Sequence, residues 1–233
     1  DRNPQRNHAL LISVATEAGA VLTPRSSGVE TASPAPSLSG VWDAMRGFNS
    51  RRFSNVVLTE KGRAALAAYS EADSPASNCV PHTAPFLPGL PYLNEILLGE
   101  ETLIIRSEFF SVDRIVYMDG RPHPANGMRS NQGHSIGRWE DDVLVVDTTL
   151  FEDHRTGNRS GNVSGIPSGA QKHVIERYKL SPDAMRLTVS FVLEDLEYLA
   201  QPLTGSVEWD YAPGFELLQF ECDPEVARRY RFQ

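Results

Sequence analysis

The chain has 233 residues, of which 40% are hydrophobic and 22% are charged, and its formal net charge is -8. This length suits one large domain that can bury a core without metal ions or many disulfides. No run of Lys and Arg occurs, which argues against nucleic-acid binding through phosphates, and no stretch approaches the roughly 20 apolar residues of a membrane-spanning helix.

Residues 1–38 are predicted to form a leader and a linker. Ala9–Ala15 is apolar, but Glu17 follows it and no clear small-residue cleavage site appears, so this run is either a signal-peptide remnant or a short helix. Ala32–Ser39 is rich in Pro and Ser, which disfavour regular structure. We therefore expect a single domain over residues 39–233, beginning near Trp42.

One helix and one disulfide are predicted in addition to the strands. Leu58–Tyr69 is rich in Ala and Leu, and Thr59 can cap it as a helix. The prolines of Pro81–Pro91 favour an irregular crossing segment. Cys79 and Cys222 each lie two residues before a proline, and we expect a bond between them, with two buried free thiols as the alternative. A disulfide would indicate the periplasm or the cell exterior.

From Tyr92 onward, alternating apolar and polar residues separated by turn signals predict a series of short strands. The expected strands span residues 95–99, 102–108, 112–119, 134–140, 143–149, 172–180, 185–194, 203–211 and 215–222. Consecutive hairpins favour a mainly antiparallel, up-and-down barrel of the lipocalin type, with one short helix near the N-terminus. A two-sheet β-sandwich is the alternative.

The block Gly133–Asp147 is the densest group of polar residues. Strand alternation places His134, Arg138 and Glu140 on one face. Asp147 on the neighbouring strand can orient His134, which is the arrangement that a general base requires. Arg138 can hold an oxyanion or an acidic substrate. In the alternative interpretation, Arg138 and Glu140 pair on the outer surface.

A second candidate lies in the Gly- and Asn-rich loop of residues 151–169, where loops of this length are often functional. Asp153 and His154 can transfer a proton there, or they belong to a solvated loop. The complete prediction names His134, His154, Asp147, Asp153 and Tyr117 as catalytic, and Arg138, Arg155, Trp139 and Trp209 as substrate-binding. Tyr117 and the tryptophans are also compatible with plain packing.

Cofactors are not expected. No Gly-rich phosphate loop precedes a helix, and no nucleophile elbow is present. No two histidines have the close spacing of a zinc motif, although several can still converge in space. We therefore predict no metal ligands, and keep a metal site as an alternative.

Several motifs resemble those of a large family of uncharacterised, exported bacterial proteins. They are Asp119–Pro124, Gly133–Glu140 and Val143–Thr148, together with Leu58–Ala65, Cys79–Pro81 and His173–Tyr178. The resemblance covers about residues 39–178; it implies export and a shared domain layout, and it implies no activity. Asp141 stands where the family more usually has Gly. The loop Asp153–Asn158 looks particular to a subgroup, so catalysis by this loop would be restricted to that subgroup.

Three functional hypotheses follow. The first is a cofactor-independent acid–base enzyme of the lyase, isomerase or cyclase type, acting on a small, partly apolar molecule in a barrel pocket. The second is a lipocalin-like ligand-binding protein, and the third is a metal-dependent hydrolase or metal-binding protein. Each has a small molecule or an ion as its partner, without nucleic acid or a membrane span, and an oligomer is possible.

Overall fold

The structure is a computed structural model that describes residues 37–45, 47, 52–70, 74–154, 157 and 165–229. The chain divides into two units, Asp1–Pro34 and Ala35–Gln233, and the description concerns the second. The predicted leader lies outside the described residues up to residue 36, as does Arg155. No helix among the described residues is long and apolar enough to span a membrane.

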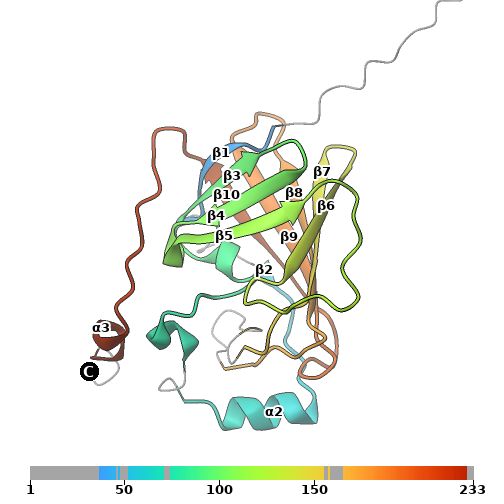
Figure 1. Cartoon of the computed structure of the whole chain (residues 1–233), viewed down its shortest axis with the longest axis vertical. Coiled ribbons are helices and arrows are strands. Elements are labelled where there is room, and N and C mark those ends of the chain that lie inside the picture. Colours follow the sequence, from blue (N-terminus) through green and yellow to red (C-terminus); the bar gives the residue numbers. More distant parts are fainter. Residues whose placement is uncertain are drawn as a thin grey trace, which may run out of the picture. The chain divides into compact units, whose positions relative to one another are not determined.

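Strands make up most of the regular structure (Figure 1). They are β1 (Gly40–Asp43), β2 (Arg52–Phe53), β3 (Leu93–Leu98), β4 (Thr102–Ser107), β5 (Val112–Tyr117), β6 (His134–Glu140), β7 (Val143–Thr149), β8 (His173–Leu180), β9 (Arg186–Glu194) and β10 (Leu203–Tyr211). The helices are α2 (Glu60–Ala67) and α3 (Pro224–Arg229), with short 3-10 turns η2 (Pro75–Asn78), η3 (Leu87–Gly89) and η4 (Phe109–Ser111).

The strands form a closed barrel, as predicted. Among the described residues the sheet has ten strands, in the order β1-β3-β4-β5-β6-β7-β8-β9-β10-β2, and β1 also pairs with β10 to close the ring. All neighbours are antiparallel except β5 and β6, which run parallel. The predicted hairpins did not include this pair. Parallel strands need a long crossover connection, and residues 118–133 provide it.

The N-terminal strand, and not the C-terminal segment, closes the barrel. Trp42 on β1 pairs with Tyr211 on β10. The prediction of a last strand over residues 215–222 is wrong, because this segment pairs with no strand that the structure describes. Two of its backbone N–H groups donate to side chains. Leu218 donates to Glu108 Oε1 at 3.1 Å and Phe220 donates to Ser111 Oγ at 2.9 Å.

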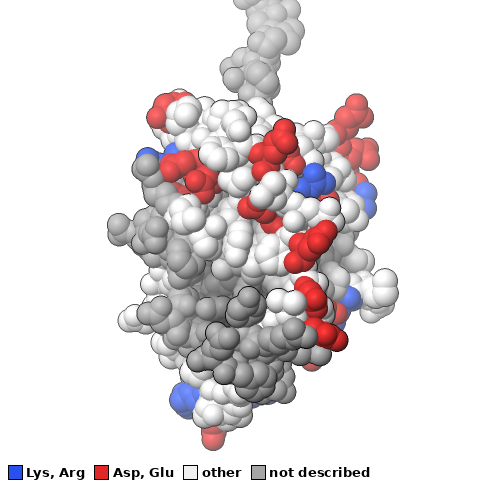
Figure 2. Space-filling model, turned by 90° about the vertical axis from the view of Figure 1, so that its left-hand side faces the viewer, with Lys and Arg blue, Asp and Glu red and all other residues white. Residues whose placement is uncertain are grey.

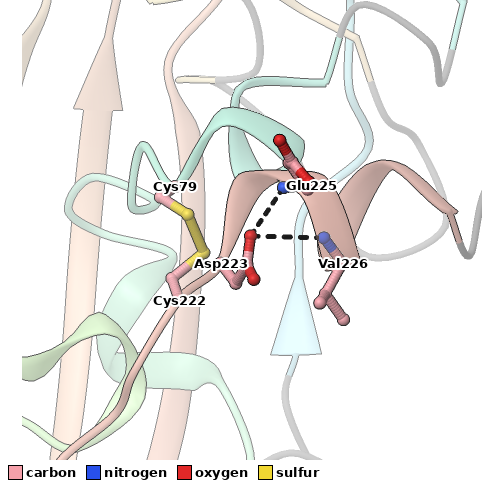
Figure 3. The surroundings of a disulfide bond; sticks show 5 residues. All are labelled: Cys79, Cys222, Asp223, Glu225 and Val226. Atoms are coloured by element: carbon pink, nitrogen blue, oxygen red, sulfur yellow. Dashed lines mark hydrogen bonds between the residues drawn. A yellow bond between two sulfur atoms is a disulfide. The ribbon is translucent and has the colours of Figure 1, made fainter.

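The predicted disulfide is present and anchors this C-terminal segment. Cys79 and Cys222 are bonded, with 143 residues separating them in sequence. Figure 3 shows the bond at the start of α3, where Asp223 Oδ1 accepts the backbone N–H of Glu225 at 2.8 Å. The bond therefore links the turn at η2 to the last helix.

Large apolar side chains fill the barrel. The buried cluster includes Trp42, Ile96, Leu103, Val116, Leu144, Tyr178, Leu187 and Trp209. Leu38, which we assigned to the linker, belongs to the same cluster, and its carbonyl accepts the indole N–H of Trp42 at 3.0 Å. The ordered fold therefore begins slightly before the predicted boundary. Buried and more exposed residues alternate along β4, β5, β8 and β9, as half-buried strands require.

The predicted helix is confirmed as α2. Thr59 caps it by accepting the Gly62 N–H at 3.0 Å, and the Thr59 hydroxyl donates to the Glu197 carbonyl at 2.7 Å. The contact between Thr59 and Glu197 holds α2 to the segment that connects β9 and β10.

On the face shown in Figure 2, the charged side chains among the described residues are mostly acidic. That the chain does not bind nucleic acid stays a prediction.

Candidate functional site

The block Gly133–Glu140 presents its histidine to the outside of the barrel. Ser135 is 1% exposed and faces inward, and Trp139 packs against the core, so alternation places His134 and Arg138 on the outer face. The predicted pocket inside the barrel is therefore not where His134 points. The interior at this level is occupied by core side chains and by a buried polar group around Arg114.

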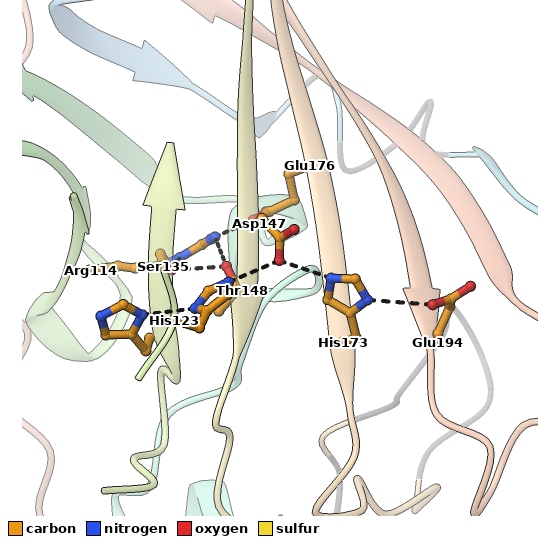
Figure 4. A network of polar contacts seen from close by, with 9 residues as sticks. Arg114, His123, Ser135, Asp147, Thr148, His173, Glu176 and Glu194 are labelled. Carbon is orange, nitrogen blue, oxygen red and sulfur yellow. Dashed lines mark hydrogen bonds and ion pairs between the residues drawn. The ribbon is translucent and has the colours of Figure 1, made fainter. Parts of the chain in front are cut away.

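A chain of polar side chains crosses the outer face from β6 to β9. We name His123, His134, Asp147, His173 and Glu194 the outer histidine network. His123 Nδ1 lies 2.9 Å from His134 Nδ1, and His123 Nε2 lies 3.1 Å from Asp147 Oδ1. On the other side, His173 Nε2 lies 2.9 Å from Asp147 Oδ1 and its Nδ1 lies 3.4 Å from Glu194 Oε2. Figure 4 shows Asp147, His173 and Glu194 following one another across neighbouring strands.

Asp147 is the central acceptor of this network. Burial would raise the pKa of Asp147, but the hydrogen bonds from His173 and His123 outweigh it and hold this pKa below its usual range. The hydrogen bond to Asp147 raises the pKa of His173, in opposition to burial. The side chains of His123, Asp147 and His173 are between 21% and 29% exposed, so solvent and a ligand can reach them.

The contact to Asp147 identifies one donor among these ring nitrogens. A carboxylate can only accept, so His123 Nε2 donates to Asp147, and when the His123 ring is neutral its Nδ1 is an acceptor. His134 then donates through Nδ1, and its Nε2 keeps a free lone pair. Burial, followed by the nearby His123 and Arg121, lowers the pKa of His134. His134 is therefore favoured as a neutral ring that can accept a proton at Nε2.

Tyr117 lies against the His134 ring. Its ring stacks on His134 with centroids 5.1 Å apart, and the Arg121 guanidinium lies 4.1 Å from the Tyr117 ring centroid. Asp119 pairs with Arg121, which lowers the pKa of Asp119 to about 2. The turn Asp119–Pro124 therefore places a cation over the last residue of β5 and His123 against the first residue of β6.

The remaining predicted substrate-binding residues do not join the network. Arg138 pairs with Glu140 at 2.6 Å on the outer surface, which is the alternative interpretation of these residues. Arg177 pairs with the same carboxylate at 2.6 Å. Trp139 packs against the core, and Trp209 is fully buried with its indole N–H donating to the Pro88 carbonyl at 2.8 Å.

His154 lies in a different environment from His134. It is 5% exposed, and its Nε2 lies 3.2 Å from the Pro81 carbonyl. Burial, together with the charge of Lys172, lowers the pKa of His154 to about 4. His154 and the exposed Asp153 border a cavity of about 440 Å³, which Tyr69, Ser168 and Tyr198 also line. The predicted catalytic residues therefore lie at two separate sites. His134, Asp147 and Tyr117 are on the outer face of the barrel, whereas His154 and Asp153 border this cavity.

The sequence patterns assigned no role to His123 or His173, and they gave no sign of Lys172 or Arg114 as residues of interest. Alternation along β8 places His173 on the same outer face as Asp147, but the register that brings strands side by side could not be known. Lys172 is fully buried, with Nζ 2.7 Å from Thr83 Oγ1 and 2.9 Å from the Gly157 carbonyl. Burial lowers the pKa of Lys172 to about 7. No sequence pattern marked it as buried.

Metal binding has no dedicated group in the described part of the chain. There, no set of three or more His, Cys, Asp or Glu side chains could hold a metal ion.

Comparison of the chain with protein-family models and with curated proteins gave no match. The family resemblance of the motifs therefore stays a prediction.

Proposed function

We propose that the chain is a cofactor-independent acid–base enzyme in which His134 Nε2 exchanges a proton with a small, partly apolar molecule. The observation that carries this proposal is the chain of contacts Asp147–His123–His134. These contacts orient His134. They also allow the Asp147 carboxylate, through His123, to stabilise the positive charge that forms when His134 takes up a proton. The substrate lies on the outer face of the barrel, and not in the interior pocket of the initial hypothesis.

The surroundings of His134 suit such a substrate. Ile115 is 49% exposed and lies two residues from Tyr117 on the outer face of β5, and Ile136 pairs with Tyr117 across β5 and β6. These side chains offer an apolar surface to part of the molecule. Arg121 and the Tyr117 hydroxyl provide a cation and a donor for charge that develops when a proton leaves carbon.

Elimination, isomerisation and cyclisation fit this arrangement best, because each removes a proton and returns one without a redox cofactor. The chemistry rests on one base and its orienting partners, and the described residues supply both. The disulfide supports export to the periplasm or the cell exterior, where such bonds persist.

A hydrogen–deuterium exchange assay tests the proposal without knowledge of the substrate. Carbonyl compounds with acidic C–H groups and apolar substituents are incubated with the protein in D2O, and the loss of C–H signal is followed by NMR. The wild-type chain is expected to accelerate exchange of at least one compound, and His134→Gln is expected to lower that rate about 100-fold or more. Arg138→Gln is the matched control on the same strand and face. Exchange that persists in His134→Gln, or its absence in the wild type, contradicts the proposal.

A second candidate is ligand binding in the cavity beside His154. Its volume of about 440 Å³ falls within the range of small-molecule pockets, about 300–1,000 Å³. Ala68, the exposed residue that follows α2, also borders it. Equilibrium dialysis against small aromatic acids and fatty acids is expected to show binding that Ala68→Phe weakens and Ala64→Phe does not. Equal binding by both variants speaks against this cavity.

A further inference from the structure

A small cavity with both apolar and polar lining residues lies inside the barrel, against Leu87 and Pro88 of η3. Four of the residues that line it are polar: Asn94, Ser107, Arg114 and Gln132. Asn94, Ser107 and Arg114 are each at most 3% exposed. Each of the four has one buried polar atom with no hydrogen-bond partner among the described residues: Asn94 Oδ1, Ser107 Oγ, Arg114 Nη1 and Gln132 Oε1. A buried polar group without a partner is destabilising, so four such groups around one space call for a ligand.

Neighbouring contacts fix the two amide groups with their oxygens unpaired. Asn94 Nδ2 donates to the Tyr92 carbonyl at 3.3 Å. Gln132 Nε2 donates to the His82 carbonyl at 3.0 Å and to Asn131 Oδ1 at 2.6 Å. A flip of either amide would place an oxygen against another oxygen. Both Asn94 Oδ1 and Gln132 Oε1 are therefore available as acceptors.

The charge of Arg114 is already balanced. Arg114 Nη2 pairs with Glu176 Oε2 and donates to Thr148 Oγ1 at 2.8 Å, and Nε donates to Ser135 Oγ at 3.0 Å. These three partners and the guanidinium appear together in Figure 4. Only Nη1 is left to donate. With Glu176 fully buried against Arg114, the cavity requires a neutral ligand and not an anion.

We propose that this cavity binds one structural water molecule. The water accepts from Arg114 Nη1–H and from the Ser107 hydroxyl, and donates to Asn94 Oδ1 and Gln132 Oε1, which satisfies both its donors and both its acceptor sites. The space open to the centre of a water molecule is about 10 Å³, which is the room that roughly one water needs.

This water would tie the loop before β6 to the barrel interior. Asn94, Ser107 and Arg114 lie on β3, β4 and β5, whereas Gln132 lies in the connection just before Gly133 and His134. Four hydrogen bonds to one water therefore link three strands of the barrel to the segment that carries His134. The inference does not depend on the proposed enzymatic activity.

Two measurements on the full-length chain test the water site. A crystal structure that resolves ordered water is expected to show one peak within about 3.2 Å of the four atoms. In solution, water 17O relaxation dispersion counts the long-lived waters, and Ser107→Val is expected to lower that count by one. Ser190→Val, a half-buried position on β9, is the matched control and leaves the count unchanged.

Gln132→Met provides a second variant, because it alters the loop and not a strand, and it is also expected to lower the count by one. The proposal is overturned if the crystal shows the four atoms paired with protein groups or with an ion. It is equally overturned if the foldable variants keep the wild-type count of long-lived waters.

Discussion

Asp147 is the residue on which the outer histidine network depends. One oxygen of this carboxylate, Oδ1, lies within 3.1 Å of both His123 Nε2 and His173 Nε2. It thereby connects a ring that accepts a hydrogen bond from His134 on one side to a ring that contacts Glu194 on the other. The properties of the two neighbouring histidines should consequently respond to a change at this single position.

Asp147→Asn is expected to lower the pKa of His173. The hydrogen bond to Asp147 is the largest factor that raises this pKa, so its loss leaves the opposing effect of burial. An NMR titration of the imidazole Cε1–H signals measures the change. Glu194→Gln serves as the comparison and should have a smaller effect, because the His173–Glu194 distance is 3.4 Å. An unchanged His173 pKa in Asp147→Asn would show that the contact does not form.

Lys172 makes stability depend on pH above neutrality. Burial lowers its pKa from 10.5 to about 7 in the folded state, so between these values the unfolded chain binds more protons. The unfolding free energy therefore rises with pH across this window, by about 5 kcal/mol for this group.

Lys172→Met removes that contribution. Denaturant unfolding at pH 7 and pH 10 should show the wild type gaining stability relative to this variant as pH rises. The exposed Lys61, whose pKa is raised by a hydrogen bond to Glu197, provides the control Lys61→Met, for which no such gain is expected. A constant difference between wild type and Lys172→Met would mean that Lys172 is not buried as described.

At the scale of elements, local sequence pattern predicted the strands well and their pairing less well. Alternation and turn residues placed β6 and β7 at the residues where the structure has them. The parallel pairing of β5 with β6 and the closure through β1 depend on contacts between distant segments, which periodicity does not encode. The same limit applies to the site. Alternation placed His134 on one face with Arg138 and Glu140 but did not identify that face as the outer one, and the contact of His134 with His123 requires the fold of residues 118–133.

The barrel should keep its strands when the C-terminal segment is no longer held by the disulfide. The Cys79–Cys222 bond closes a long loop, and its reduction is expected to lower the unfolding free energy by about 4 kcal/mol. Because β1 closes the sheet, the strands should persist when the bond is broken at 25 °C.

Circular dichroism with and without a reducing agent measures both effects. The melting temperature should fall while the strand signal before melting stays the same. The double variant Cys79→Ser and Cys222→Ser should be insensitive to the reducing agent. Loss of the strand signal on reduction would mean that the C-terminal segment is needed to hold the barrel together.

At the scale of the whole molecule, the barrel separates a buried polar group from a solvent-accessible one. Arg114 on β5 and Glu176 on β8 pair inside, where both side chains are at most 4% exposed, and the outer histidine network lies on the outer face of β6 to β9. The interior pair holds the sheet together, and the exterior network is free to contact other molecules.

Glu176→Gln should therefore destabilise the whole fold. It leaves the Arg114 charge buried without a counterion, which costs about 3–5 kcal/mol. Glu140→Gln removes a carboxylate from an exposed ion-pair group on the outer face and should cost less than about 1 kcal/mol. Urea unfolding of both variants makes the comparison. Equal losses would show that the interior pair is not desolvated.

The central claim is that Asp147 and His123 leave His134 Nε2 unprotonated and available as a base. Long-range 15N–1H correlation NMR on the 15N-labelled chain near pH 7 reads the protonation of each ring nitrogen directly. The expected spectrum shows His123 as the Nε2–H form and His134 as the Nδ1–H form with a non-protonated Nε2. A His134 ring that carries its proton on Nε2, or on both nitrogens at that pH, would contradict the account.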